Sequence, residues 1–298
     1  MRRVTWIICL LVCICLPCSL SAQTPDANWW ESEMLIATGY GAAKDKIGSP
    51  THTRALAKRA AVMDAYRKLA QQARAIHITA SETIDSQIKA GNISANKIDA
   101  VIKGATVLQE DYDSYGNCTV VMSVPLYGVT DSLATAALKP VAKEDFPPPS
   151  KGTVASGNYT GLIIDCGDSD LTPVLTPVIR DADNQTIYSF NNLDYEKVIA
   201  RGMVGYVTRN NPLFARQVNF FMPLSTANFF MFISAKTNAA RAGSNPLIIK
   251  AQRMSDGNSC PVISAEDADR ILAENNASHF LDDGAVVFTS YRVGGLRA

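Results

Sequence analysis

RALAKRAAVMDAYRKLAQQARAI, residues 54–76, carries six cations and one acid among its apolar residues. At 100° per residue, one set of apolar residues falls within an arc of about 80°, which is typical of the core-facing side of an amphipathic helix. That set is Ala55, Val62, Tyr66, Leu69, Ala73 and Ile76. The cations are dispersed around the other sides. The stretch therefore predicts the core helix of a small domain, with its cations forming a solvated surface.

The dispersed charge also bears on partners. A helix that binds nucleic acid concentrates its cations on one face, and a helix that lies on a membrane has a bulkier apolar face than one so rich in alanine. Without Met1–Ala22 the chain has 26 cations against 28 acids, so it has no general attraction for nucleic acid or anionic lipid. We expect no nucleic-acid partner.

The segments around this helix complete a first domain. Residues 29–43 predict a strand that enters a glycine-containing turn, and residues 94–105 predict a second helix with Ser94 as its cap. Residues 106–128 predict two strands around a turn at residues 114–117. The first domain, residues 23–142, is thus expected to be a small α+β unit with a strand, two helices and a hairpin.

Three stretches of this domain carry a family resemblance: ATGYGAA (residues 37–43), the helix 54–76 and IKGATVLQEDYDSYGNCTVVMSVPL (residues 102–126). Together they resemble the bacterial 20-kilodalton surface lipoprotein family, a domain type that is also similar to the amino-terminal part of flagellar assembly protein T. The resemblance covers roughly residues 33–130. It implies an envelope protein of structural or accessory type, sometimes linked to flagellar assembly, and supplies no catalytic residues.

The amino terminus predicts export. MRRVTWIICLLVCICLPCSLSAQTP, residues 1–25, has two arginines, an apolar run and a small-residue stretch that ends at Ala22. This is the layout of a secretory signal, with cleavage expected after Ala22. The run is shorter than the roughly 20 apolar residues that span a bilayer, and the best later stretch, residues 219–235, contains Pro223. The mature chain is expected in the periplasm or on the cell surface, without a transmembrane segment.

The cysteines leave alternatives open. Cys18 is a candidate for lipidation, which would make an outer-membrane lipoprotein, but Pro17 precedes it where the signal peptidase needs small residues. After the signal, Cys118, Cys166 and Cys260 remain, an odd number for an oxidising compartment. Either Cys166 and Cys260 form a disulfide, or all three pack as small apolar side chains.

A change in composition divides the chain. KEDFPPPSKGTVASGN, residues 143–158, has three consecutive prolines followed by small polar residues, which predicts an interdomain linker. Residues 159–298 are expected to form a second α/β or α+β domain, with the Phe- and Met-rich stretch 219–234 in its core. The predicted fold is α+β with two small domains, the second a mixed sheet with helices.

Evidence for catalysis is sparse in the sequence. Asp165 follows a predicted buried strand, a position where α/β proteins place functional groups, although a cap or turn residue is the commoner role. The acidic stretches 168–170 and 181–184 lack the ligand spacing of a calcium loop, so we predict no metal and no cofactor. We expect a non-enzymatic protein that binds envelope or flagellar components. The alternatives are a periplasmic enzyme or a small-ligand carrier that uses the second domain.

Overall fold

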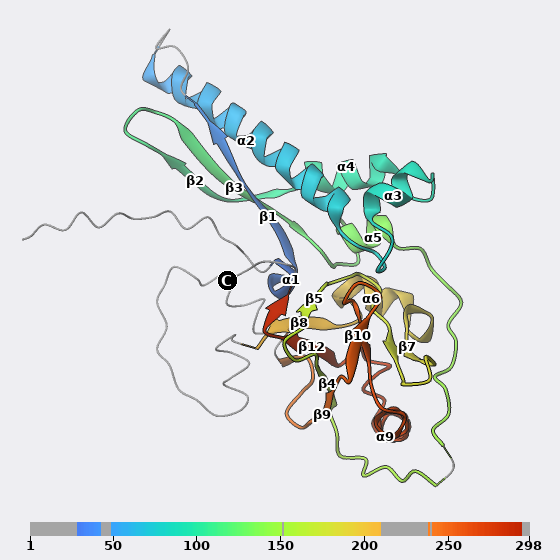
Figure 1. Cartoon of the computed structure of the whole chain (residues 1–298). Helices are drawn as coiled ribbons and strands as arrows, with labels where there is room; N and C mark the ends of the chain where they lie inside the picture. The colour runs from blue at the N-terminus through green and yellow to red at the C-terminus, as the bar shows by residue number, and fades with distance from the viewer. Residues whose placement is uncertain (1–28, 43–48, 151, 210–237, 239, 294–298) are drawn as a thin grey trace, which may run out of the picture.

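The computed structural model describes residues 29–42, 49–150, 152–209, 238 and 240–293 (Figure 1). They form an α+β protein of two domains, which confirms the predicted fold class. The first domain contains α1 (Trp29–Ser32), β1 (Met34–Gly41), α2 (Pro50–Ala75), α3 (Ile84–Lys89), α4 (Ala95–Lys103), β2 (Thr106–Tyr112), β3 (Cys118–Pro125) and α5 (Leu133–Ala137). Its sheet is antiparallel with the order β1-β3-β2. In the part of the chain that is described, no helix has the length and apolar character needed to span a membrane.

Small residues join the long helix α2 to this sheet. The buried residues of α2 are Ala57, Ala61, Ala65, Leu69 and Ala73. Gly39 and Gly41 of β1 lie against them, and a Cβ added to Gly39 would be only 2.0 Å from the carbonyl oxygen of Ala61. The helix backbone therefore packs almost directly on the strand backbone, which only glycine and alanine allow.

The predicted core stripe of this helix is partly wrong. Leu69, Ala73 and Ile76 are buried as expected, but Ala55 is exposed, and Val62 and Tyr66 are only half-buried. The hydrophobic pattern predicted that the larger side chains would be buried, whereas the close approach of β1 leaves room only for small side chains on the buried face of α2. The cations are also more than a solvated surface, because Lys68 Nζ donates to the carbonyl oxygen of Thr38 at 2.7 Å.

The second domain is built on a parallel sheet. Its elements are β4 (Gly161–Asp165), β5 (Asp170–Leu171), β6 (Ile179–Arg180), β7 (Thr186–Tyr188), η1 (Phe190–Asn192), α6 (Tyr195–Arg201), β8 (Gly205–Thr208), β9 (Pro246–Lys250), β10 (Arg253–Ser255), β11 (Cys260–Val262), α9 (Ala265–Ser278), β12 (Val286–Ser290) and β13 (Arg292–Val293). The order β8-β12-β4-β9 is parallel throughout, and a smaller mixed sheet has the order β10-β11-β6-β7. The predicted core stretch 219–234 lies outside the described residues.

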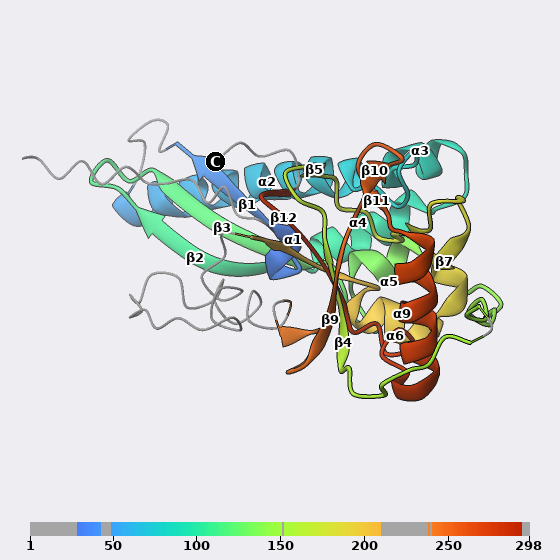
Figure 2. The same cartoon turned by 60° about the horizontal axis from the view of Figure 1, so that its bottom comes forward.

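Alternate residues of the parallel strands face two different apolar clusters. Ile164 of β4 and Phe288 of β12 belong to the large core that also holds Ile271 of α9. The neighbouring Ile163 and Val287 belong to a small cluster on the opposite face. Helices α6 and α9 both lie on one side of the sheet (Figure 2). The central position of β12, whose five residues are all buried, matches its continuous apolar sequence.

The predicted linker has no helix or strand among its described residues, but it lies against the second domain. Glu274 of α9 accepts three hydrogen bonds from it: from Ser156 N at 2.8 Å, Ser156 Oγ at 2.9 Å and Gly157 N at 2.9 Å. Burial raises the pKa of Glu274, but these hydrogen bonds outweigh it and hold the pKa below its ordinary value. The Phe146 ring stacks on Tyr188 at 6.3 Å.

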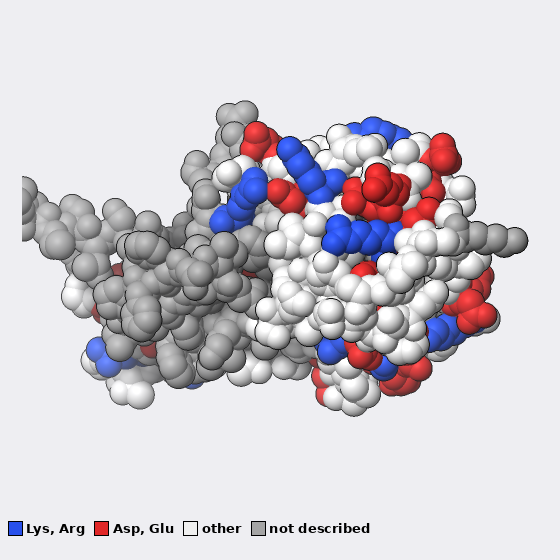
Figure 3. Space-filling view, turned by 90° about the horizontal axis from the view of Figure 1, so that it is seen from below, with Lys and Arg blue, Asp and Glu red and all other residues white. Residues whose placement is uncertain are grey.

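Both domains contribute to one apolar core. Trp30 of α1 packs edge-on against Tyr206 of β8, with 5.4 Å between ring centroids, and both rings are buried. Gly128 N of the first domain donates to the carbonyl oxygen of Ile199 in α6 at 2.7 Å. Seen from below, described cations and acids are interspersed on the surface, with no large area of one sign (Figure 3).

Candidate functional site

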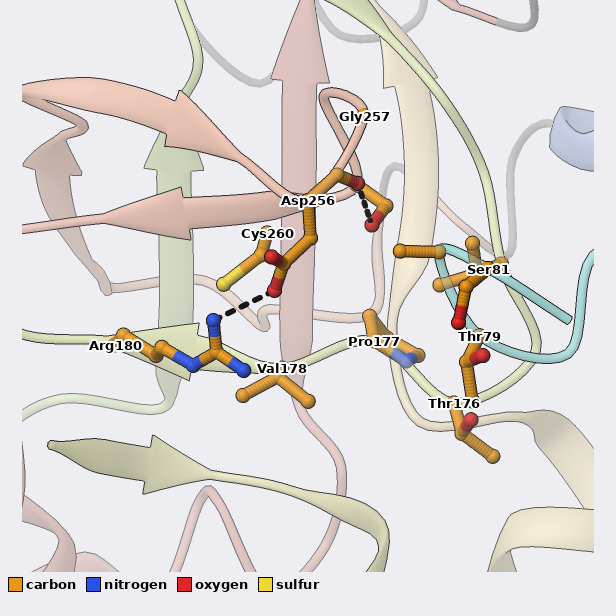
Figure 4. A pocket seen from close by; sticks show the side chains of 12 residues that line it. Thr79, Ser81, Thr176, Pro177, Val178, Arg180, Asp256, Gly257 and Cys260 are labelled. Carbon is orange, nitrogen blue, oxygen red and sulfur yellow. Dashed lines mark hydrogen bonds and ion pairs between the residues drawn. The ribbon is translucent and has the colours of Figure 1, made fainter. Parts of the chain in front are cut away.

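A cleft of about 540 Å³ lies where the two domains meet. Its lining comes from three segments, namely the turn after α2, the chain leading into β6, and the β10–β11 hairpin (Figure 4). The lining residues are Thr79, Ala80, Ser81, Val174, Thr176, Pro177, Val178, Arg180, Asp256, Gly257, Ser259 and Cys260.

Main-chain pairing between the domains positions this cleft. The carbonyl oxygen of His77 accepts from Leu175 N at 2.9 Å, and that of Ile78 accepts from Thr176 N at 2.9 Å. The next residues reverse direction, because Ile78 N and Thr79 N both donate to the carbonyl oxygen of Glu82. Ser81, at the tip of this turn, is thereby held at the entrance of the cleft.

The opposite wall is a tight hairpin turn. Asp256, Gly257 and Asn258 have φ values of 50°, 61° and 65°, a run of left-handed backbone conformations that favours Gly, Asn and Asp. Ser259 Oγ donates to the carbonyl oxygen of Asp256 at 2.7 Å. Thr172 N donates to the carbonyl oxygen of Asn258 at 3.0 Å, and this bond fixes the hairpin turn to the chain segment that leads into β6.

The two charged lining residues neutralise each other. Arg180 Nη1 lies 2.6 Å from Asp256 Oδ2, and both side chains are partly exposed at the rim. Beside them the thiol of Cys260 is buried, and this burial raises its pKa. The thiol therefore stays protonated at neutral pH and is a poor nucleophile. Hydroxyl and aliphatic groups make up the rest of the lining, which suits neutral polar or apolar groups of a ligand.

Asp165 is not part of this cleft. It ends β4 at the carboxyl edge of the parallel sheet, where Oδ2 accepts from Arg209 Nη2 at 2.8 Å and Oδ1 accepts from Gly167 N at 3.0 Å. The Arg209 guanidinium in turn lies over the Tyr291 ring at 4.9 Å. These contacts are those of a turn residue held in an ion pair.

The described histidines lie apart from Asp165. His52 is in the first turn of α2, and His77 joins the domains through its carbonyl oxygen. His279 ends α9 in a left-handed conformation with Nδ1 3.6 Å from Asp282. The structure therefore does not bring Asp165 and a histidine together within the described residues.

The three cysteines among the described residues, Cys118, Cys166 and Cys260, are buried, and none is bridged in the structure. The disulfide considered between Cys166 and Cys260 is not formed. Burial raises the pKa of Cys166 to about 12, and the charge of Asp165 adds to this effect. Cys18 and Ala22 lie outside the described residues.

The acidic stretch 181–184 forms a turn. Asp181 Oδ1 accepts from Gln185 N at 2.7 Å, and Asn184 has a φ of 67°. Within the described ranges, no group of three or more His, Cys, Asp or Glu residues is arranged to hold a metal ion.

Sequence reasoning missed the cleft itself. The polar turn 255–259 is a visible hairpin signal, but its position opposite Ser81 depends on pairing between residues 77–78 and 175–176. That pairing joins segments about 100 residues apart, and no local pattern marks it.

Residues 161–290 match the family model described as Treponema pallidum Tp0624, second domain. The match begins with the first residue of β4 and ends with the last residue of β12, so it spans the whole parallel sheet. It includes two walls of the cleft but not the turn 79–81. No curated protein matches the chain.

Proposed function

We propose that this protein is a non-catalytic accessory protein of the bacterial cell envelope, which binds another envelope component, or a flagellar one, at the junction of its two domains. The observation that carries the proposal is the cleft between Ser81 and the 255–259 turn. Main-chain hydrogen bonds between the domains fix its walls, and its two charged residues are paired with each other. A preformed, electrically neutral cleft recognises a partner by shape and hydrogen bonding.

The envelope location rests on the sequence. Residues 1–22 have the layout of a secretory signal, and residues 33–130 resemble the surface lipoprotein family and the amino-terminal part of flagellar assembly protein T. Similarity of residues 161–290 to a Treponema pallidum domain is in keeping with a bacterial source for the second half. The flagellar part of the proposal comes from the first-domain resemblance alone.

The contacts of the reactive residues support a binding role. The Asp165 carboxylate is held by Arg209 and by the main chain of Gly167. In the cleft, Thr176 Oγ1 donates to a carbonyl oxygen at 2.7 Å and Ser259 Oγ does the same, so neither hydroxyl is aligned with a base.

Photo-crosslinking in intact cells tests the proposal. A benzophenone amino acid at Ser81 or Val178 would face the cleft, and Val154, which is 89% exposed in the linker segment, is the matched control. We expect adducts with defined envelope proteins from both cleft positions and not from the control. Equal adducts from all three positions, or recovery of the full chain in the cytosol, would refute the proposal.

The cleft also favours a second candidate, a small-ligand carrier, because its volume of about 540 Å³ lies within the usual range for small-molecule sites. Native mass spectrometry of the protein purified from its periplasm would detect a retained molecule. A bound mass that is lost on Ser259→Trp substitution would support the carrier, and an unliganded mass would leave the protein-binding role.

A further inference from the structure

The sheet of the first domain has two outer edges, and the fold treats them differently. At the β1 edge, side chains of α2 bond the main chain. Asp64 Oδ2 accepts from Tyr40 N at 3.1 Å, and Lys68 Nζ donates to the carbonyl oxygen of Thr38 at 2.7 Å. Because Thr38 and Tyr40 are two residues apart, their outward main-chain groups point to the same side of the strand. This edge is sealed against another strand.

The β2 edge has no such cover among the described residues. β2 pairs with β3 and with no other described strand. Six of its seven residues are exposed, including Val107 at 45% and Leu108 at 44%. Tyr115, in the turn that follows, is 83% exposed. The hairpin extends away from the second domain (Figure 1), so this edge is separate from the cleft.

Part of β2 keeps the geometry that an added strand needs. The register shifts between Val107 and Gln109, a bulge that disturbs the beginning of the strand. From Gln109 to Tyr112 the pairing with β3 is regular. An exposed edge of this kind is a template for strand addition.

The side chains of β2 define the chemistry of the added strand. On the side facing α2, Glu110 is paired with Lys58 at 2.6 Å, and Tyr112 lies under the Arg54 guanidinium at 5.7 Å. Val107, opposite Met122, is on that same side. On the other side Asp111 is exposed and accepts from Gln109 Nε2 at 2.5 Å. In the regular part of β2, the α2 side thus presents the Tyr112 ring beside a Glu110 carboxylate that is already paired, and the other side presents the Asp111 carboxylate.

Charge disfavours a second copy of this chain as the occupant. Residues 105–130 contain three acids, Glu110, Asp111 and Asp113, and no Lys or Arg. In an antiparallel pair of two β2 strands, Asp111 and Asp113 of both copies would lie close together with no cation in either hairpin, and the nearby Lys58 is already paired with Glu110.

We propose that the outer edge of β2 binds an extended segment of a partner protein in which Lys or Arg alternates with aliphatic residues. Within the regular part of β2, the aliphatic residues lie beside the exposed Tyr112 ring on the α2 side, and the cations lie beside Asp111 on the other side. Main-chain hydrogen bonds to β2 supply affinity, and the alternation supplies specificity. This surface is independent of the cleft and of the function proposed for it.

Blocked heptapeptides test this with the full mature chain. The probe alternates lysine and valine. One control is a peptide that alternates glutamate and valine. The other control is the lysine peptide with N-methyl groups on alternate residues. Hydrogen exchange is followed by mass spectrometry over residues 106–112, with the already sealed strand 34–41 as an internal reference. We expect the lysine peptide to slow exchange in β2 several-fold while neither control does so.

Charge reversal at the exposed Asp111 gives the matched variant. Asp111→Lys should lose the response to the lysine peptide and gain one to the glutamate peptide, which a merely unfolded hairpin would not do. The proposal is overturned if millimolar lysine peptide leaves exchange in β2 unchanged, or if the N-methylated peptide acts equally well. A protein that dimerises by itself with β2 already protected would assign the edge to a second copy instead.

Discussion

Arg241 of the second domain places Nη2 2.8 Å from Oε1 of Glu33 in the first, and the arginine side chain is only 7% exposed. The same guanidinium donates to the carbonyl oxygens of Gly202 and Arg201. Burial raises the pKa of Glu33, and the charge of Arg241 partly offsets this. The pair therefore joins the domains through a buried charge that depends on its partner.

Replacing this arginine should destabilise the whole protein. Arg241→Met leaves the largely buried Glu33 carboxylate without its ion-pair partner and with only the weaker charge of Arg201 nearby, which should lower the unfolding free energy, measured with urea at neutral pH, by about 3 kcal/mol. Lys197→Met is the control, since Lys197 and Asp283 are 52% and 62% exposed and should contribute less than about 1 kcal/mol. The loss of unfolding free energy in Arg241→Met should become smaller as the pH falls through the raised pKa of Glu33, because protonation removes the charge of the carboxylate. Equal losses in the two variants would contradict this account.

The contact between β1 and α2 predicts a severe effect from one methyl group. In Gly39→Ala the new Cβ would lie 2.0 Å from Ala61 O and 2.5 Å from Ala65 N, and both are backbone atoms that cannot rotate away. We expect a loss of about 3 kcal/mol in urea unfolding. The control is Gly104→Ala, where the nearest atom would be 3.3 Å away and φ is −79°. A Gly39→Ala protein as stable as this control would show that the helix is not in close contact.

Asp64 gives a pH dependence of known sign. Hydrogen bonds from Lys68 and then Arg67 lower its pKa to about 2, from an ordinary value of 3.8. A carboxylate with a lowered pKa stabilises the fold above its unfolded pKa, and this contribution is lost as the pH falls through the folded value. Asp64→Asn should therefore cost roughly 1 kcal/mol at pH 7 and progressively less between pH 4 and pH 2.

An NMR titration that follows the carboxyl carbon of Asp64 separates the effects of Lys68 and Arg67 on its pKa. Lys68→Gln should raise the pKa of Asp64 more than Arg67→Gln does, because Lys68 is the larger cause of the shift. Arg67 is 70% exposed in its pair with Asp64, whereas Lys68 also bonds the edge of β1. The reverse order would contradict the sealing role of Lys68.

The buried thiols predict a simple labelling result. Burial raises the pKa of Cys118, Cys166 and Cys260, so an aromatic disulfide reagent should label none of them rapidly in the folded protein. In guanidinium without reductant, all three should react in a chain prepared without residues 1–22, which hold the other four cysteines. A single reactive thiol would show that two cysteines are bridged.

Local patterns predicted most of the elements. The hairpin β2–β3 and the helix α4, which begins after Ser94, were both predicted, and so was the strand β4 that ends at Asp165. The six-residue α3 was missed because it spans less than two helical turns. Periodicity located α2 but favoured Val62 and Tyr66 over Ala61 and Ala65, since the sequence of a helix does not show how closely a strand will approach.

The candidate site was less accessible to such reasoning. Asp165 ends a strand, as its sequence context predicts, but its bond to Arg209 joins residues 44 positions apart. The cleft depends on contacts between residues near 78 and residues near 176. Sites assembled from distant segments need the tertiary structure.

The contact of Trp30 with Tyr206 has a consequence for synthesis. The two rings lie 5.4 Å apart in the finished protein, but the ribosome makes Trp30 about 176 residues earlier. At a synthesis rate of ~5–20 residues per second, Tyr206 is made roughly 9–35 s after Trp30. Over that interval a holding chaperone could bind it, and folding of the amino-terminal end is completed only after most of the chain has been made.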